Sequence, residues 1–129
     1  MLEVPLPLGK LLFEAENPSL LQIIAMMREN GWDADYELVC STTYLLEVTA
    51  KGANKGGMVR RLAERLGISM EHVYCVGDES NDISMLTVAA EGFAPANCTE
   101  AVRACGATIV ADAEHDALAE IIAILDQRY

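Results

Sequence analysis

The first third of the chain begins with two apolar patterns of different period. Residues 9–13 (Gly-Lys-Leu-Leu-Phe) have the composition of a short strand. A helix is predicted to follow, with Asn17 as its N-cap, Pro18 at its first position and Gly31 at its end. Its apolar face, spaced as in a helix, consists of Leu20, Leu21, Ile24 and Met27.

Two short segments rich in β-branched and aromatic residues come next. They are Tyr36–Cys40 and Tyr44–Thr49, separated by Ser-Thr-Thr. This arrangement is typical of a β-hairpin. Residues 1–49 are therefore predicted to form one α+β region.

A different rhythm begins near Ala50. Three glycines (52, 56 and 57) mark a loop before an amphipathic helix, and the apolar run Val73–Gly77 is typical of a strand buried on both faces of a parallel sheet. Helices and strands then alternate, with helices predicted at 82–89, 100–105 and 114–125 and strands at 92–96 and 107–111. Residues 50–129 are therefore predicted to form an open, parallel α/β sheet.

Composition excludes several classes of protein. Of the 129 residues, 52% are hydrophobic and 22% charged, which indicates a globular chain. The net charge of −11 argues against nucleic acid or an anionic membrane as the main partner. No apolar run approaches the length of a membrane span, and the N-terminus lacks the pattern of a secretion signal, so a cytoplasmic location is expected.

Candidate chemistry follows the strand Val73–Gly77, where the sequence reads Asp78-Glu-Ser-Asn81-Asp82. In open α/β sheets, ligands bind beyond the carboxyl ends of the strands. Carboxylates in such a place suit Mg²⁺, which usually takes one or two of them together with waters and substrate phosphate. The alternative is an acidic turn whose side chains only cap the next helix. These five residues alone do not decide between the two.

The wider spacing resembles the C-terminal motifs of haloacid dehalogenase-type hydrolases, in particular the Cof-type sugar-phosphate phosphatases. Lys55 in its glycine-flanked loop, the helix, the strand and Gly-Asp-x-x-Asn-Asp at 77–82 carry this resemblance. Residues 94–98 (Ala-Pro-Ala-Asn-Cys) match less well, since the family more often has Met-Gly-Asn-Ala there. The resemblance implies that residues 1–49 are part of the family's cap and residues 50–129 the C-terminal part of its Rossmann-like core.

The resemblance also implies a role for each matched residue. Asp78 would be a Mg²⁺ ligand, and Lys55 would lie near the nucleophile and the transferring phosphoryl group. Asn81 would contact phosphate or a metal-bound water, Asp82 would hold the loop and Lys55, and Asn97 would contact substrate. The implied activity is Mg²⁺-dependent hydrolysis of phosphomonoesters of sugars or similar small metabolites, with a phosphomutase as the enzymatic alternative.

One motif of the family does not occur in the sequence. The nucleophile and the general acid of these enzymes belong to an Asp-x-Asp motif at a strand tip. Asp33-Ala-Asp35 has this spacing, but no apolar strand leads into it, so a solvated turn is predicted. The chain is therefore expected to be a fragment that is inactive by itself. A non-catalytic domain that binds metal, phosphate or a protein partner is the alternative.

The missing motif also has a consequence for assembly. In the family's sheet the Asp-x-Asp strand lies beside the equivalent of Val73–Gly77, which would otherwise expose an unpaired edge. Either a homo-oligomer or replacement by the strand Lys10–Phe13 is expected.

Overall fold

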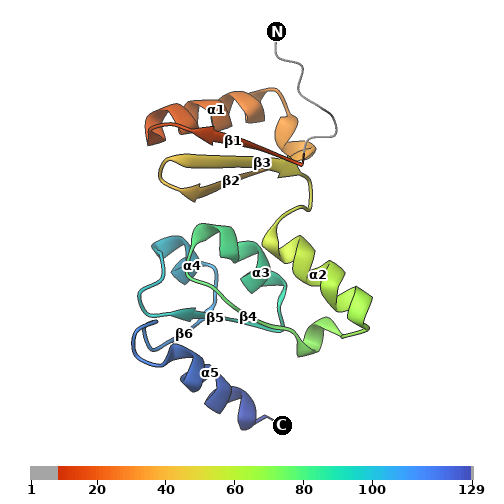
Figure 1. Ribbon diagram of the computed structural model, residues 1–129, viewed down its shortest axis with the longest axis vertical. Coiled ribbons are helices and arrows are strands. Elements are labelled where there is room, and N and C mark those ends of the chain that lie inside the picture. Colours follow the sequence, from red (N-terminus) through yellow and green to blue (C-terminus); the bar gives the residue numbers. More distant parts are fainter. Residues whose placement is uncertain (1–8, 129) are drawn as a thin grey trace. The chain divides into compact units, whose positions relative to one another are not determined.

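The computed structural model describes residues 9–128 (Figure 1). The chain divides between Asn54 and Lys55 into two compact units. The first unit contains a three-stranded antiparallel sheet, and the second contains a three-stranded parallel sheet. The predicted α/β class is confirmed. The assignment of residues 1–49 to a cap and 50–129 to a core stays a prediction.

The described part of the first unit consists of three strands, one long helix and the short turn η1 (Trp32–Ala34), which follows the helix. The elements are β1 (Lys10–Glu14), α1 (Asn17–Glu29), β2 (Tyr36–Thr42) and β3 (Leu45–Ala50). The strand order is β1-β3-β2, so the predicted hairpin is confirmed as the β2–β3 pair. β2 runs two residues further than predicted, with an irregularity between Cys40 and Thr42.

The core of the first unit lies between α1 and the sheet. Leu20 and Met27 of α1 pack with Leu46 and Val48 of β3, and all four side chains are buried. Gly31 follows the helix with a φ of 71°, as expected for a glycine that ends a helix. The predicted N-cap was wrong by one residue. Glu16 is the N-cap because its carbonyl already accepts the N–H groups of the first turn.

The second unit alternates helices and strands, as predicted. Its elements are α2 (Lys55–Leu66), η2 (Met70–His72), β4 (Tyr74–Val76), η3 (Ser80–Asp82), α3 (Ile83–Val88), β5 (Glu91–Pro95), α4 (Glu100–Ala104), β6 (Thr108–Val110) and α5 (Ala117–Asp126). The strands are parallel in the order β4-β5-β6, with β5 in the centre (Figure 1).

The central strand β5 connects two apolar clusters. Ala94 belongs to a cluster with Leu86 of α3 and Val102 of α4, whereas Phe93 belongs to one with Ala117 and Ile121 of α5. Neighbouring residues of a strand point to opposite faces, so helices cover both faces of the sheet. This burial fixes the strands whose carboxyl ends carry the candidate site.

The strand Val73–Gly77 is covered on both faces, as predicted, but less completely. Cys75 of β4 packs in the cluster of α3 and α4 and Tyr74 packs against that of α5, whereas Val76 is 37% exposed. Within the described residues β4 pairs with β5 alone, so the edge that was expected to be vacant without the Asp-x-Asp strand is unpaired. The expected replacement by Lys10–Phe13 was wrong, because β1 pairs with β3 in the antiparallel sheet. Within residues 9–128, no helix combines the length and apolar character that crossing a bilayer requires.

Candidate functional site

The acidic loop leaves the carboxyl end of β4 and folds back on itself within a few residues. Gly77 makes this possible, because a Cβ at this position would lie 2.4 Å from the Cβ of Asp82. The loop then forms the single turn η3 and continues directly into α3. The acidic residues therefore lie at the strand tip, where the sequence predicted them.

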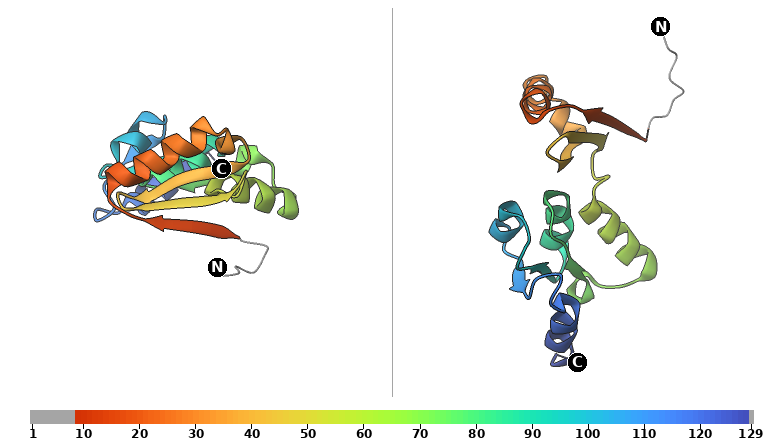
Figure 2. Two further views of the ribbon diagram at one scale, coloured as in Figure 1. Left: turned by 90° about the horizontal axis from the view of Figure 1, so that it is seen from above. Right: turned by 60° about the vertical axis from the view of Figure 1, so that its left-hand side comes forward.

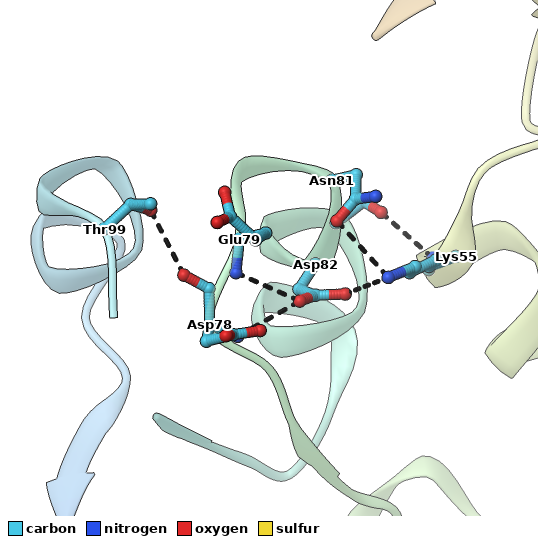
Figure 3. Close-up of polar contacts among 8 residues, drawn as sticks. Lys55, Asp78, Glu79, Asn81, Asp82 and Thr99 are labelled. Carbon is cyan, nitrogen blue, oxygen red and sulfur yellow. Dashed lines mark hydrogen bonds and ion pairs between the residues drawn. The ribbon is translucent and has the colours of Figure 1, made fainter. Parts of the chain in front are cut away.

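Asp82 is the centre of this loop (Figure 3). It is only 4% exposed. Its Oδ2 accepts the N–H groups of Asp78 at 3.0 Å and Glu79 at 3.1 Å, and its Oδ1 pairs with the ammonium of Lys55. Burial alone would raise the pKa of Asp82, but the hydrogen bonds from Lys55 and from these two N–H groups together lower it below its usual value. An ionised carboxylate therefore holds the loop closed.

Lys55 is the first residue of α2, so its predicted place in a loop was wrong. The helix begins earlier because its first turn packs against α3: the Gly56 N–H donates to Ser84 Oγ at 3.1 Å, and Gly56 is buried. The Lys55 ammonium binds Asp82 and donates to Asn81 Oδ1 at 3.3 Å (Figure 3). Its side chain remains 48% exposed, so the cation is held in place and still accessible to a ligand.

Asp78 is held by its backbone. Its N–H binds Asp82, and its carbonyl accepts hydrogen bonds from the N–H of Thr99 at 3.0 Å and from Thr99 Oγ1 at 3.3 Å (Figure 3). Asp78 is exposed, and no residue between 9 and 128 hydrogen-bonds its carboxylate. The carboxylate is therefore available to a ligand while its peptide is fixed on both sides.

This donor set fits part of a magnesium site. An exposed carboxylate at a strand tip is a hard oxygen ligand, and Mg²⁺ usually takes one or two such ligands with waters and phosphate oxygens. The described residues contain no group of three or more His, Cys, Asp or Glu side chains that could hold a metal ion. Asp78 could thus contribute one ligand, and the rest would come from elsewhere.

The other candidates lie outside this cluster. Asn97, after β5, is exposed, and its Oδ1 accepts the N–H of Ala113 at 3.1 Å, which ties together the loops after β5 and β6. Its contact with substrate stays a prediction. Asp33 and Asp35 are exposed around η1, with no strand leading into them, in agreement with the predicted solvated turn.

Two residues that support the site were missed in the sequence. Thr99 holds the carbonyl of Asp78, and Ser84 holds the start of α2 beside Asp82. Thr99 carried a weak signal, since threonine before a helix is a common N-cap. Neither partner could be predicted, because each hydrogen bond joins residues more than 20 positions apart.

The lowered pKa of Asp82 predicts a pH dependence of stability. A carboxyl whose pKa is lower in the folded state stabilises the fold above its unfolded-state pKa, about 3.9. This contribution is lost as the pH falls through the lower, folded-state value. The free energy of unfolding should therefore fall between about pH 5 and about pH 2, where the proton concentration rises about 10³-fold. The fall should be steeper in the wild type than in Asp82→Asn. Equal slopes in urea titrations across this range would contradict the assignment.

Comparisons with known proteins agree with this fold. The model of the haloacid dehalogenase-like hydrolase family matches residues 3–122. A phosphoglycolate phosphatase of Halorubrum lacusprofundi is 36% identical over 106 residues, which are 81% of this chain and 46% of that protein. The pyridoxal phosphate phosphatase YbhA of Escherichia coli is 36% identical over 77 residues, which are 60% of this chain and 28% of that protein.

Solved structures give the same result. A haloacid dehalogenase-like hydrolase from Bacteroides thetaiotaomicron superposes with a TM-score of 0.72 at 27% identity, covering 95% of this chain and 46% of that one. The fold and the site thus define a class of protein. Its members have an α/β unit in which an acidic loop at one strand tip pairs with a lysine. The chain belongs to the haloacid dehalogenase-like hydrolase family, and the predicted resemblance is confirmed. It spans less than half of the length of the curated relatives named above.

Proposed function

We propose that this chain supplies the lysine and metal-binding half of a Mg²⁺-dependent phosphomonoester hydrolase acting on small phosphorylated metabolites. The observation that carries the proposal is the cluster around Asp82 at one strand tip. There Asp82 holds the Lys55 ammonium and the backbone of Asp78, whose carboxylate is free. The names of the phosphoglycolate and pyridoxal phosphate phosphatases support this class of substrate. A homo-oligomer and a cytoplasmic location stay predictions.

Each side chain has a distinct part in this proposal. Lys55, held by Asp82, would place its ammonium against the phosphoryl group and offset the negative charge on its oxygens. Asn81 accepts from Lys55 through Oδ1, which leaves its amide N–H₂ to donate to phosphate. Asp78 would hold the metal through its carboxylate, and bound Mg²⁺ would add further positive charge beside the phosphate. Asn97 would reach the substrate from the neighbouring strand tip.

The proposal assigns none of these four groups as the nucleophile toward phosphorus. Lys55 is tied to a carboxylate, the two amides are not nucleophilic, and the Asp78 carboxylate is assigned to the metal. The reaction therefore needs a further carboxylate of the Asp-x-Asp kind. We therefore expect the 129-residue chain, in Mg²⁺, to hydrolyse p-nitrophenyl phosphate no faster than a buffer blank. If the chain does hydrolyse p-nitrophenyl phosphate and Asp33→Asn abolishes this activity, the nucleophile is Asp33 in the predicted solvated turn.

The decisive experiment uses the reading frame that contains this chain. If coding sequence before Met1 adds an Asp-x-Asp strand, the longer product should show Mg²⁺-dependent phosphatase activity. Lys55→Met should then lower kcat by about a hundredfold or more, as removal of a preorganised charge partner does. Glu114→Gln is the matched control and should leave kcat unchanged, because Glu114 is exposed and its side chain has no hydrogen bond to any residue between 9 and 128. A longer product with the motif and no activity would refute the proposal.

The metal role can be tested on the chain itself. One carboxylate with waters makes a weak site, so Mg²⁺ should bind only at millimolar or higher concentration (about 4 kcal/mol or less of binding free energy). NMR shifts on Mg²⁺ titration should centre on Asp78 and disappear in Asp78→Asn. Tight binding that survives this substitution would place the metal elsewhere.

The alternative is a non-catalytic domain that binds metal, phosphate or a protein partner. It is favoured if no Asp-x-Asp segment accompanies this chain in any expressed product. In that case inorganic phosphate should still bind near Lys55, and Lys55→Met should abolish the binding.

A further inference from the structure

Thr99 occupies the N-cap position of α4 but does not cap this helix. Its backbone is extended, with φ at −64° and ψ at 156°, and its carbonyl accepts the N–H of Arg103 at 3.0 Å. A threonine in this position usually accepts an N–H of the first helical turn through its side-chain oxygen. Thr99 makes no such hydrogen bond to the first turn of α4, all of which the structure describes. Its hydroxyl is therefore not engaged in stabilising the helix that it begins.

The hydroxyl of Thr99 binds the loop after the neighbouring strand instead (Figure 3). Oγ1 donates to the carbonyl of Asp78 at 3.3 Å, and the backbone N–H of Thr99 donates to the same oxygen at 3.0 Å. A carbonyl oxygen has two lone pairs, so these two donors occupy it fully. Asp78 can therefore offer its carboxylate to a ligand, but not its carbonyl.

The support on which Thr99 stands does not depend on a cap. α3 and α4 lie on one side of the parallel sheet and α5 lies on the other (Figures 1 and 2). Val102 of α4 is fully buried in one cluster with Ala94 of β5, and the guanidinium of Arg103 donates to the carbonyl of Ala96 at 2.5 Å. These contacts fix α4 against the sheet, so the helix keeps Thr99 in place although its cap is missing.

The two peptides that flank the Cα of Asp78 are both held. Asp82 Oδ2 accepts the N–H groups of Asp78 and Glu79, and Thr99 donates to the carbonyl between them. Because each peptide is planar, these contacts fix the direction in which the Cβ of Asp78 points. Asp82 also binds Lys55, whereas the hydrogen bonds of Thr99 within the described part of the chain do not include that lysine. The effect of Thr99 on Asp78 can therefore be separated from that of the ion pair.

We propose that Thr99 is a positioning residue, whose hydroxyl orients Asp78 so that the carboxylate is held ready for Mg²⁺. This role rests on the proposed function, in which Asp78 holds the metal. Thr99 does not touch the metal and acts only through the peptide of Asp78. The affinity of the site for Mg²⁺ thus depends on a side chain from the loop after β5, and α4 loses its cap in exchange.

Thr99→Val removes the hydroxyl and keeps both the backbone N–H and the shape of the side chain. It should weaken Mg²⁺ binding at Asp78 by about three- to tenfold, the range expected for one hydrogen bond. Thr99→Ser keeps a hydroxyl and should bind Mg²⁺ within about twofold of the wild type. Thr108→Val is the matched control, because it removes a hydrogen bond of 2.7 Å to Glu91 at the amino ends of β5 and β6. This control should leave Mg²⁺ binding unchanged.

NMR titration of the 129-residue chain with MgCl₂ at constant ionic strength measures the binding. Shifts that remain in Asp78→Asn report binding elsewhere and are subtracted. Urea unfolding of each variant measures stability in parallel. A threonine with a purely structural role would lower stability in Thr99→Val without changing the affinity for Mg²⁺. Weaker binding in Thr99→Val, recovery in Thr99→Ser and no change in Thr108→Val would support the positioning role.

Two results would overturn the positioning role and leave the metal assignment intact. In the first, the wild type binds Mg²⁺ through Asp78 and Thr99→Val binds it equally well. In the second, Thr99→Ser binds as weakly as Thr99→Val. If no binding depends on Asp78, the metal assignment and the role of Thr99 both fail. Should Thr99→Val not fold, Thr99→Ala compared with Thr99→Ser makes the same test of the hydroxyl with smaller side chains.

Discussion

Replacing Asp82 with alanine is expected to destabilise the second unit by about 3 kcal/mol. The substitution removes the acceptor of two loop N–H groups and the partner of Lys55. Most of the loss should come from the two N–H groups. The ion pair itself contributes less, because the Lys55 side chain is 48% exposed and water screens its charge.

Urea unfolding followed by circular dichroism measures this change. Trp32, the only tryptophan, lies in the first unit, so its fluorescence is an internal control that should not change. Glu114→Ala, an exposed acidic site in the same unit as Asp82, is the matched variant and should cost less than about 0.5 kcal/mol. Similar destabilisation by the two substitutions would mean that Asp82 does not organise the loop.

Gly56→Ala is expected to cost about 2 kcal/mol or more, even though alanine favours a helix over glycine by about 1 kcal/mol. A Cβ at Gly56 would lie 2.1 Å from the carbonyl oxygen of Ser84 and 2.6 Å from its carbonyl carbon. Both are backbone atoms, so the clash cannot be relieved by rotating a side chain. The starts of α2 and α3 would have to separate, and Lys55 would move away from Asp82.

The control for this prediction is a glycine without close neighbours. A Cβ at Gly9 would meet nothing within 4 Å, so Gly9→Ala should leave the stability unchanged. Ser84→Ala tests the second part of the contact, because it removes the hydroxyl that accepts the Gly56 N–H and should cost about 1 kcal/mol. If Gly56→Ala is as stable as the wild type, the two helices do not approach as closely as described.

Local patterns were sufficient to predict the secondary structure and the position of the acidic loop. The hairpin, the alternation of helices and strands and the placement of Asp78 at a strand tip all depend on residues close in sequence. Apolar periodicity and turn residues report on such short-range structure directly. Lys55, the helix, the strand and the motif at 77–82 together indicated the family, which the comparisons confirm.

Long-range contacts decided what the sequence could not. An apolar run has the same composition in a central strand as in an edge strand, so only the sheet order showed that β1 lies at an edge among the described residues. The vacant edge of β4 was expected only because the resemblance places the missing Asp-x-Asp strand beside it. Lys55 was predicted in a loop because glycines disfavour helices, but packing of Gly56 against Ser84 outweighs this propensity. Lys55 meets Asp82, and Thr99 meets Asp78, across more than 20 positions of the sequence. These contacts form because the start of α2 and the loops after β4 and β5 come together at the carboxyl edge of the parallel sheet.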